Sequence, residues 1–360
     1  MFANVKKINF YSGPAILPDS VILQAAEAIN DFAGTGLSIL EISHRSNEFV
    51  NVMEEARALV RELLQLNADR EVLFMQGGGA SQFFIVPMNL LNENETAAYL
   101  DTGQWAHLAM EEAKNFGKVH IAASSREEKY RSIPKELSLP DKVKYLHLTT
   151  NNTIYGTQIS DSQIKSLQAL GIPLVADMSS DIFSRRLDFN RFDLIYAAAQ
   201  KNAGAAGVTI VVVNKNILGS VKRKLPKMLD YRQHIERKSM YNTPPVFSVY
   251  VSWLTLKWIK EQGLENIEQQ NIRKAKILYE AIDQSSFFQS MAEPDDRSLM
   301  NVCFTAKNPA DEERFLQFAA ARNIVGIKGY RTVGGFRASI YNAMSEEGVA
   351  QLAQTIRDFK

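Results

Sequence analysis

Lys201 is the residue whose sequence neighbours most favour a reactive side chain. It lies in the stretch Ala197–Gly207, whose other members are small or uncharged, between two apolar runs. Burial there would lower the pKa of the lysine and leave more of the neutral amine that forms Schiff bases with carbonyl groups. A lysine whose charged end reaches solvent from a Gly- and Ala-rich turn would have the same neighbours. This segment by itself does not separate the two interpretations.

Asp177 ends another apolar run, Leu174–Ala176. In an open parallel sheet, groups at the carboxyl ends of strands line the ligand crevice. An acidic side chain there could be a base, a metal ligand, a ribose contact or a helix cap. The cap is a serious alternative, because Ser179, Ser180 and Asp181 follow.

A glycine turn, Gly77–Gly79, separates a strand-like run from a helical pattern. Small residues let consecutive backbone amides point into one concavity at a helix N-terminus, which binds phosphate. A tight turn without a ligand would use the same glycines, and the spacing matches neither the P-loop nor the dinucleotide fingerprint. The turn permits a phosphate site without requiring one.

Together, the turn, the acid and the lysine are the parts that pyridoxal phosphate needs. The turn would anchor its phosphate, Asp177 would keep the pyridine nitrogen protonated, and Lys201 would bind its aldehyde. Trp105, after another apolar run, offers a ring for stacking, although a core tryptophan fits the same pattern. The combination favours this cofactor, and no metal site is expected.

The elements that must position these residues follow from the period of the apolar residues. Residues 20–32 and 49–64 have helical spacing. Short apolar runs, most of them alternating with helix-length segments, predict a mostly parallel sheet with helices on both sides. These runs are 72–75, 97–100, 119–122, 145–148, 173–176, 194–197 and 208–213. The last follows its predecessor too closely for a crossover helix, so we expect it to be antiparallel.

A second unit follows this sheet. From Val246 a long helical stretch leads away, and then come a strand-like run at 300–304 and a helix from about Glu346. We therefore predict an α/β fold with a large cofactor-binding domain, 16–260, and a smaller C-terminal α/β domain, 261–360, joined by the segment 1–15.

Composition excludes several classes of partner. The 360 residues carry 41 basic and 40 acidic side chains, so no global field favours nucleic acid or an anionic membrane. No apolar stretch approaches the ~20 residues that span a bilayer, and the N-terminal residues lack the apolar core of a signal peptide. The single cysteine, Cys303, allows no intramolecular disulfide and suits a reducing, cytoplasmic location.

Motifs over essentially the whole chain resemble the phosphoserine aminotransferase family, and the order of glycine turn, acid and lysine is that of the aspartate-aminotransferase-like fold (fold type I). The motifs are 12–15, 41–46, 77–79, 176–180, 199–202, 241–245 and 335–343. The resemblance implies transamination between L-glutamate and 3-phosphohydroxypyruvate, which yields O-phospho-L-serine and 2-oxoglutarate for serine biosynthesis. The family often also accepts the phosphorylated hydroxythreonine precursor of pyridoxal phosphate.

The resemblance also implies residue roles. Lys201 would bind the cofactor and move a proton between the substrate Cα and the cofactor C4′, while Asp177 would pair with the pyridine nitrogen. Other cofactor contacts would come from Trp105 at the ring, Thr153 at the phenolic oxygen, and Gly79, Ala80 and Gln200 at the phosphate. Asn242 and Thr243 would reach the phosphate from a neighbouring subunit, which implies a homodimer. The substrate α-carboxylate would bind Arg337, and its distal anionic group would meet His44, Arg45 and Arg331.

Two departures from the family pattern bear on phosphate recognition. Ala80 stands where many members have an arginine, and Tyr330 stands where the usual Lys-Gly-His-Arg has its histidine. Arg186 and Ala205 replace frequent prolines and bear only on loop rigidity.

Two other functions compete with this interpretation. The chain could be another enzyme of the same fold, such as an alanine–glyoxylate type aminotransferase or a cysteine desulfurase. A desulfurase needs a nucleophilic cysteine on a mobile loop, whereas Cys303 lies in a strand-like run. A non-catalytic, dimeric binding protein would have no need for a Schiff-base lysine.

Overall fold

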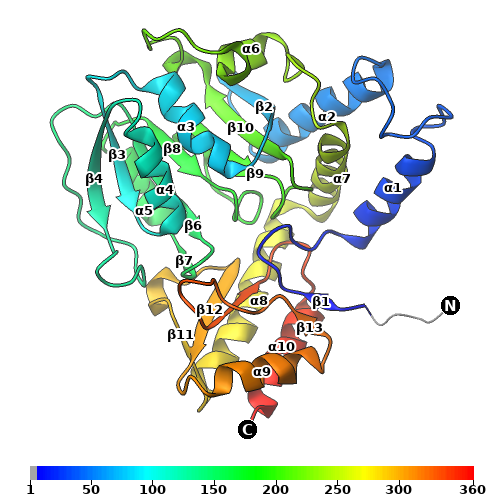
Figure 1. Ribbon diagram of the computed structural model, residues 1–360, viewed down its shortest axis with the longest axis vertical. Helices are drawn as coiled ribbons and strands as arrows, with labels where there is room; N and C mark the ends of the chain where they lie inside the picture. The colour runs from blue at the N-terminus through cyan, green and yellow to red at the C-terminus, as the bar shows by residue number, and fades with distance from the viewer. Residues whose placement is uncertain (1–5) are drawn as a thin grey trace.

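The central element of the computed structural model, which describes residues 6–360, is a seven-stranded sheet with the order β2-β10-β9-β8-β5-β3-β4 (Figure 1). Its strands are β2 (Arg70–Gln76), β3 (Thr96–Asp101), β4 (Lys118–Ser124), β5 (Leu146–Thr149), β8 (Leu174–Asp177), β9 (Leu194–Ala198) and β10 (Val208–Asn214). Each of the seven apolar runs predicted to form the mostly parallel sheet overlaps one of these strands. The predicted α/β class is confirmed.

Strand direction places several chain turns at one edge of the sheet. β10 is antiparallel to both β2 and β9, as predicted for residues 208–213, and the other neighbours are parallel. Because β10 reverses the direction between them, β2 and β9 point the same way. The carboxyl ends of β2, β3, β5, β8 and β9 therefore lie at the same edge, where an open α/β sheet binds ligands.

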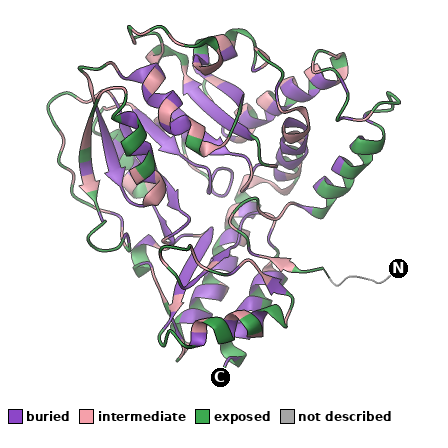
Figure 2. Cartoon of the chain, in the orientation of Figure 1, coloured by how far each residue is buried: buried purple, intermediate pink, exposed green. Residues whose placement is uncertain are grey.

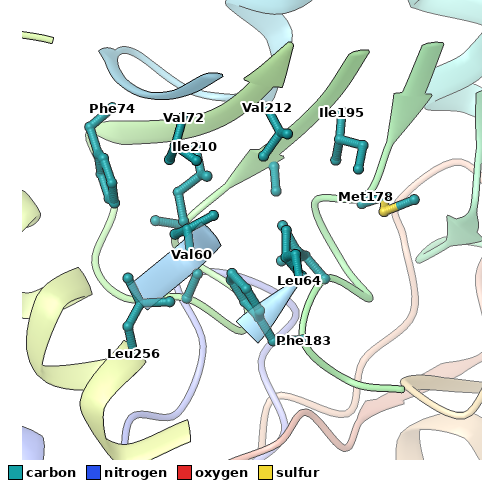
Figure 3. Close-up of a cluster of buried hydrophobic side chains, with 14 of the residues drawn as sticks. Val60, Leu64, Val72, Phe74, Met178, Phe183, Ile195, Ile210, Val212 and Leu256 are labelled. Carbon is teal, nitrogen blue, oxygen red and sulfur yellow. The ribbon is translucent and has the colours of Figure 1, made fainter. Parts of the chain in front are cut away.

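Successive residues of a strand point to opposite faces of the sheet, and both faces are apolar. Helices cover both faces. Val72 and Phe74 pack with Val60 in one core cluster (Figure 3). Leu73 and Met75 belong to another. The helices of the first cluster are α1 (Asp19–Asn30), α2 (Asn47–Leu63), α5 (Asp161–Gln168) and α7 (Val246–Gln262). Those of the second are α3 (Gly79–Leu90), α4 (Gln104–Ala113) and α6 (Tyr231–Glu236).

The C-terminal part forms a smaller α/β unit with its own core. Its antiparallel strands β11 (Phe288–Ser290), β12 (Asn301–Ala306) and β14 (Phe336–Ser339) pack with α8 (Leu264–Asp283), α9 (Asp311–Ala320) and α10 (Glu346–Asp358). Figure 2 shows buried residues gathered on both sheets. The division at residue 260 stays a prediction.

The N-terminal segment joins the smaller unit. β1 (Ile8–Asn9) pairs in parallel with β13 (Ile324–Val325). Residues 1–5 of the predicted segment 1–15 lie outside the described residues. Within 6–360, no helix is both long and apolar enough to cross a membrane.

A small hairpin at the sheet edge was not predicted. It consists of β6 (Asn151–Asn152) and β7 (Thr157–Gln158), and its turn contains Thr153. Two-residue strands leave no period in the sequence, so only the folded chain reveals this turn.

Candidate active site

The predicted cofactor residues come together at the carboxyl edge of the large sheet. Asp177 is the last residue of β8, Lys201 follows the adjacent β9, and the glycine turn follows β2. Trp105 is the second residue of α4, shortly after β3, and Thr153 lies in the hairpin turn that comes after β5. These strands share one direction, so residues far apart in the sequence reach the same crevice.

The glycine turn has the form of an anion site. Gly79 begins α3, and the Gly78 cap position supplies no side-chain acceptor to the amides of the first turn. A Cβ on Gly79 would lie 3.1 Å from the Ser179 hydroxyl, so a side chain there would crowd this hydroxyl. The Ser179 Oγ in turn accepts a hydrogen bond from the Ala198 amide at 3.1 Å. Free amides at the start of a 12-residue helix can bind a phosphate.

Asp177 is buried, and the loop that follows it orients its carboxylate. Its Oδ1 accepts a hydrogen bond from the Ser179 amide at 2.9 Å, but turns rather than a helix follow, so Asp177 is not a helix cap. Burial raises the pKa of the Asp177 carboxyl above its usual value, and the nearby Lys201 and the bond from Ser179 oppose that rise. No hydrogen bond to Oδ2 is found among residues 6–360, which leaves that oxygen for a ligand.

Lys201 is held in a desolvated position. Burial lowers the pKa of its amine to about 8, with a further contribution from the positive charge of Arg337, while Asp177 acts in the opposite sense. The N-terminal segment packs on its stem, because a Cβ on Gly13 would lie 3.5 Å from the Lys201 Cγ. Gly13 has a φ of +146°, which only glycine adopts without strain. The Ala15 amide also donates to the Gln200 carbonyl at 2.9 Å.

Trp105, Thr153 and Arg337 form one connected group above this crevice. The Trp105 Nε1 donates to the Thr153 Oγ1 at 3.0 Å, and the Arg337 Nη1 donates to the Thr153 carbonyl at 3.4 Å. Tyr330 lies edge-on to Trp105 with ring centroids 6.5 Å apart. The group links the elements of the seven-stranded sheet to Arg337 on β14 of the smaller unit.

Pyridoxal phosphate fits this donor set. Among the described residues, three buried polar atoms near the edge have no partner: Thr149 Oγ1, Asn152 Oδ1 and Arg337 Nε. Buried polar atoms are normally paired, so these three suit a polar ligand. Sequence reasoning assigned no role to Thr149, Asn152 or Ser179. Only the Ala176–Ser180 motif gave a signal for Ser179.

The residues predicted to bind the distal anionic group or to serve a neighbouring subunit make few contacts within one chain. His44 and Arg45 lie on the connection between α1 and α2, which Figure 1 shows at the margin of the molecule, and Arg45 is exposed. Within residues 6–360, neither Arg45 nor Arg331 pairs through its guanidinium. Asn242 is also exposed, while the Thr243 carbonyl accepts a hydrogen bond from Gln76 beside the glycine turn.

Cys303 does not provide a nucleophile. It lies in β12 and is buried, and burial raises the pKa of its thiol to about 12. Its Sγ donates weakly to the Thr153 carbonyl at 3.7 Å. A thiol in this position stays protonated at neutral pH, which argues against a desulfurase.

Comparisons with known proteins agree with this arrangement. The family model for class-V aminotransferases matches residues 8–352. The phosphoserine aminotransferase of Flavobacterium psychrophilum is 52% identical over 99% of both chains. Among solved structures, phosphoserine aminotransferase from Bacillus circulans subsp. alkalophilus is 43% identical, with a TM-score of 0.93 over 98% of both chains. The PLP-bound enzyme from Trichomonas vaginalis is 33% identical, with a TM-score of 0.91 over 98% of this chain and all of that one.

Both the family model and the close relatives extend over nearly the full chain, and the fold of the solved enzymes is the fold described above. The chain therefore belongs to the phosphoserine aminotransferase family of the class-V, pyridoxal-phosphate-dependent aminotransferases.

Proposed function

We propose that this protein transfers the amino group of L-glutamate to 3-phosphohydroxypyruvate, producing 2-oxoglutarate and O-phospho-L-serine. The observation that carries the proposal is the desolvated amine of Lys201 beside the buried Asp177 in a chain 52% identical to a phosphoserine aminotransferase. A binding protein would gain nothing from an amine whose charged form is disfavoured by burial.

Bound pyridoxal phosphate would supply a ring that withdraws electrons from the substrate Cα. In the proposal, Lys201 holds the cofactor aldehyde, and its Nζ later moves the proton at Cα. Asp177 faces the pyridine nitrogen with its Oδ2, while the amides of Gly79 and Ala80, together with Gln200, hold the phosphate. Burial that disfavours a lone Asp177 carboxylate strengthens its pairing with a protonated nitrogen.

Trp105 and Thr153 are proposed to orient the ring together. The hydrogen bond from Trp105 Nε1 to Thr153 Oγ1 fixes the plane of the indole. Because this hydroxyl already accepts one bond, its own proton remains available to a phenolic oxygen of the cofactor. This hydrogen bond thus orients both the indole that stacks on the ring and the hydroxyl that donates to the phenolic oxygen.

Arg337 is proposed to bind the substrate α-carboxylate. Its Nη1 is tethered to the Thr153 carbonyl, and its buried Nε lacks a partner among the described residues. A guanidinium with an unused edge presents parallel donors to a carboxylate. This contact would place the substrate Cα beside Lys201.

We propose that the active form is a homodimer. Several large apolar side chains are exposed on α1 and the connection after it, namely Ile22, Leu23, Ile29, Leu37 and Leu40. Exposed apolar patches of this kind mark protein interfaces. The same connection carries His44 and Arg45. If a second copy of the chain covers this connection, these two side chains would lie near the active site of that copy. Asn242 and Thr243 would serve the neighbouring cofactor phosphate in the same dimer.

Two finer points complete the proposal. The phosphorylated hydroxythreonine derivative has the same two anionic ends as phosphoserine, so the same arginines could accept it in pyridoxine biosynthesis. A reducing cytoplasm is proposed as the location, since the single cysteine is free and buried.

A half-reaction panel tests the proposal. Amino acids are added singly to the purified protein with bound cofactor, and the visible spectrum reports amino transfer. Glutamate and phosphoserine should react, and the aminated enzyme should prefer 3-phosphohydroxypyruvate to unphosphorylated hydroxypyruvate. Equal rates with both acceptors, or no reaction with glutamate, would contradict the assignment.

Arginine variants test the distal group. Arg45→Ala and Arg331→Ala should each cost about 2–4 kcal/mol in kcat/KM for the phosphorylated acceptor, the scale of a lost charge-assisted pair. Arg357→Ala, an exposed change on α10, is the control and should have no effect. Equal losses on phosphorylated and unphosphorylated acceptors would mean that these arginines do not read the phosphate.

A further inference from the structure

Two segments that follow site residues and the helix α8 meet at a cluster of buried asparagines. Asn202 comes directly after Lys201, and Asn342 lies just beyond β14, the strand of Arg337. The third, Asn271, lies on α8. All three are buried, although none has an apolar side chain. Buried amides persist where their hydrogen bonds hold a particular arrangement.

Asn202 connects the lysine loop to the segment of Asn342 and to the loop that follows Asp177. Its Oδ1 accepts a hydrogen bond from the Asn342 backbone amide at 3.0 Å. Its Nδ2 donates to the Ser180 carbonyl at 3.1 Å, on the loop that follows Asp177. The Asn202 side chain therefore links the loops that follow Lys201 and Asp177 to the segment that follows β14.

Asn342 secures the same junction with its side chain. Its Nδ2 donates to the Phe183 carbonyl at 2.9 Å, in the large domain. Its Oδ1 accepts from the Nδ2 of Asn271, 2.9 Å away, and this Nδ2 also donates to the Ser184 carbonyl at 2.9 Å. Phe183 itself has a left-handed φ of +58°, so its carbonyl is held in an orientation that a relaxed chain would rarely adopt.

Lys274 holds the chain beyond β14 from the small-domain side. One turn after Asn271 on α8, its Nζ donates to the carbonyls of Ile340, Tyr341 and Met344 at 3.0, 2.8 and 3.0 Å. The lysine is almost wholly buried. Residues 340–344 are thus fixed on one side by Lys274 and on the other by Asn202.

We infer that Asn202 and Asn342 are positioning residues that set the separation of Arg337 from Lys201. The inference rests on the proposed function, in which Arg337 holds the substrate carboxylate and Lys201 acts at Cα. These two residues belong to different domains, and the asparagines bridge those domains directly behind them. Small displacements between a binding group and a reacting group cost large factors in rate and affinity.

Binding of glutarate, a dicarboxylate without an amino group, tests the inference without turnover. Calorimetry on the holoenzyme measures its dissociation constant for the parent, Asn202→Ala and Asn342→Ala. Both variants should bind glutarate about tenfold more weakly or worse, the scale of a buried hydrogen bond lost. Their KM for glutamate should rise by at least that factor.

Asn89→Ala is the matched control. Asn89 is equally buried and donates to the carbonyls of Ile85 and Leu229 at 2.9 and 2.7 Å, and it bridges no domains. Urea unfolding should show a comparable loss of stability, with glutarate binding as in the parent. Equal weakening in Asn89→Ala, or parent-like binding in both site variants, overturns the inference.

Two further outcomes remain informative. If Asn342→Ala does not fold, Asn342→Asp replaces it, since the aspartate keeps the acceptor for Asn271 and sets a carboxylate oxygen against the Phe183 carbonyl in place of the donor. Weakened glutarate binding in that variant supports the inference, and unchanged binding overturns it. A parent enzyme that neither binds glutarate nor reacts with glutamate would instead refute the proposed function, and the inference with it.

Discussion

The pKa of Lys201 offers the sharpest test of the site electrostatics. In the cofactor-free protein its amine should titrate at about 8 rather than at the usual 10.5. The difference corresponds to about 3 kcal/mol in the cost of charging the amine. At pH 8 about half of the amine is then neutral, compared with about one part in 300 for an ordinary lysine. The neutral fraction rises as pH increases through that value.

Two substitutions should shift this pKa in opposite directions. Asp177→Asn removes a negative charge that favours the protonated amine, so the pKa of Lys201 should fall further. Arg337→Gln removes a positive charge that disfavours it, so the pKa should rise. Each change should alter the ratio of neutral to charged amine on the order of tenfold, as expected when a neighbouring charge is removed from a buried site.

Competitive acetylation with a trace of anhydride measures this titration directly. The cofactor is removed, samples are labelled over a range of pH, and mass spectrometry quantifies the peptide containing Lys201. Arg357→Gln, on the outer surface of α10, controls for net charge. Shifts of the same sign in Asp177→Asn and Arg337→Gln, or no shift in either, would refute the reasoning.

Further expected outcomes concern the same residues and the core. Lys201→Ala should abolish turnover yet keep the cofactor bound through its phosphate, and borohydride should no longer attach it to the protein. Asp177→Asn should lower kcat far more than it raises KM in steady-state kinetics. Tyr330→His should keep or improve activity and make its pH profile steeper near neutrality, because histidine titrates there. Lys274→Met should lower the free energy of unfolding by about 3 kcal/mol or more in urea, whereas exposed Lys276→Met should not, since only Lys274 satisfies buried carbonyls.

Much of this architecture could be predicted from the sequence because its signals are local. Continuous apolar runs marked every strand of the large sheet, and the short link before Val208 implied its antiparallel direction. The glycine turn, Asp177 and Lys201 each follow such a run, and parallel strands bring their carboxyl ends to one edge. The sequence therefore indicated the cofactor chemistry before any contact between these residues was known.

Tertiary structure alone decided which side chains meet. The bond from Trp105 to Thr153 and the placement of the Ser179 hydroxyl beside Gly79 join segments whose separation in sequence carries no periodic signal. The same holds for the bridge between Asn202 and Asn342, since a buried asparagine resembles a surface one until its partners are seen. The arrangement of the whole folded chain, rather than any local preference, sets these contacts.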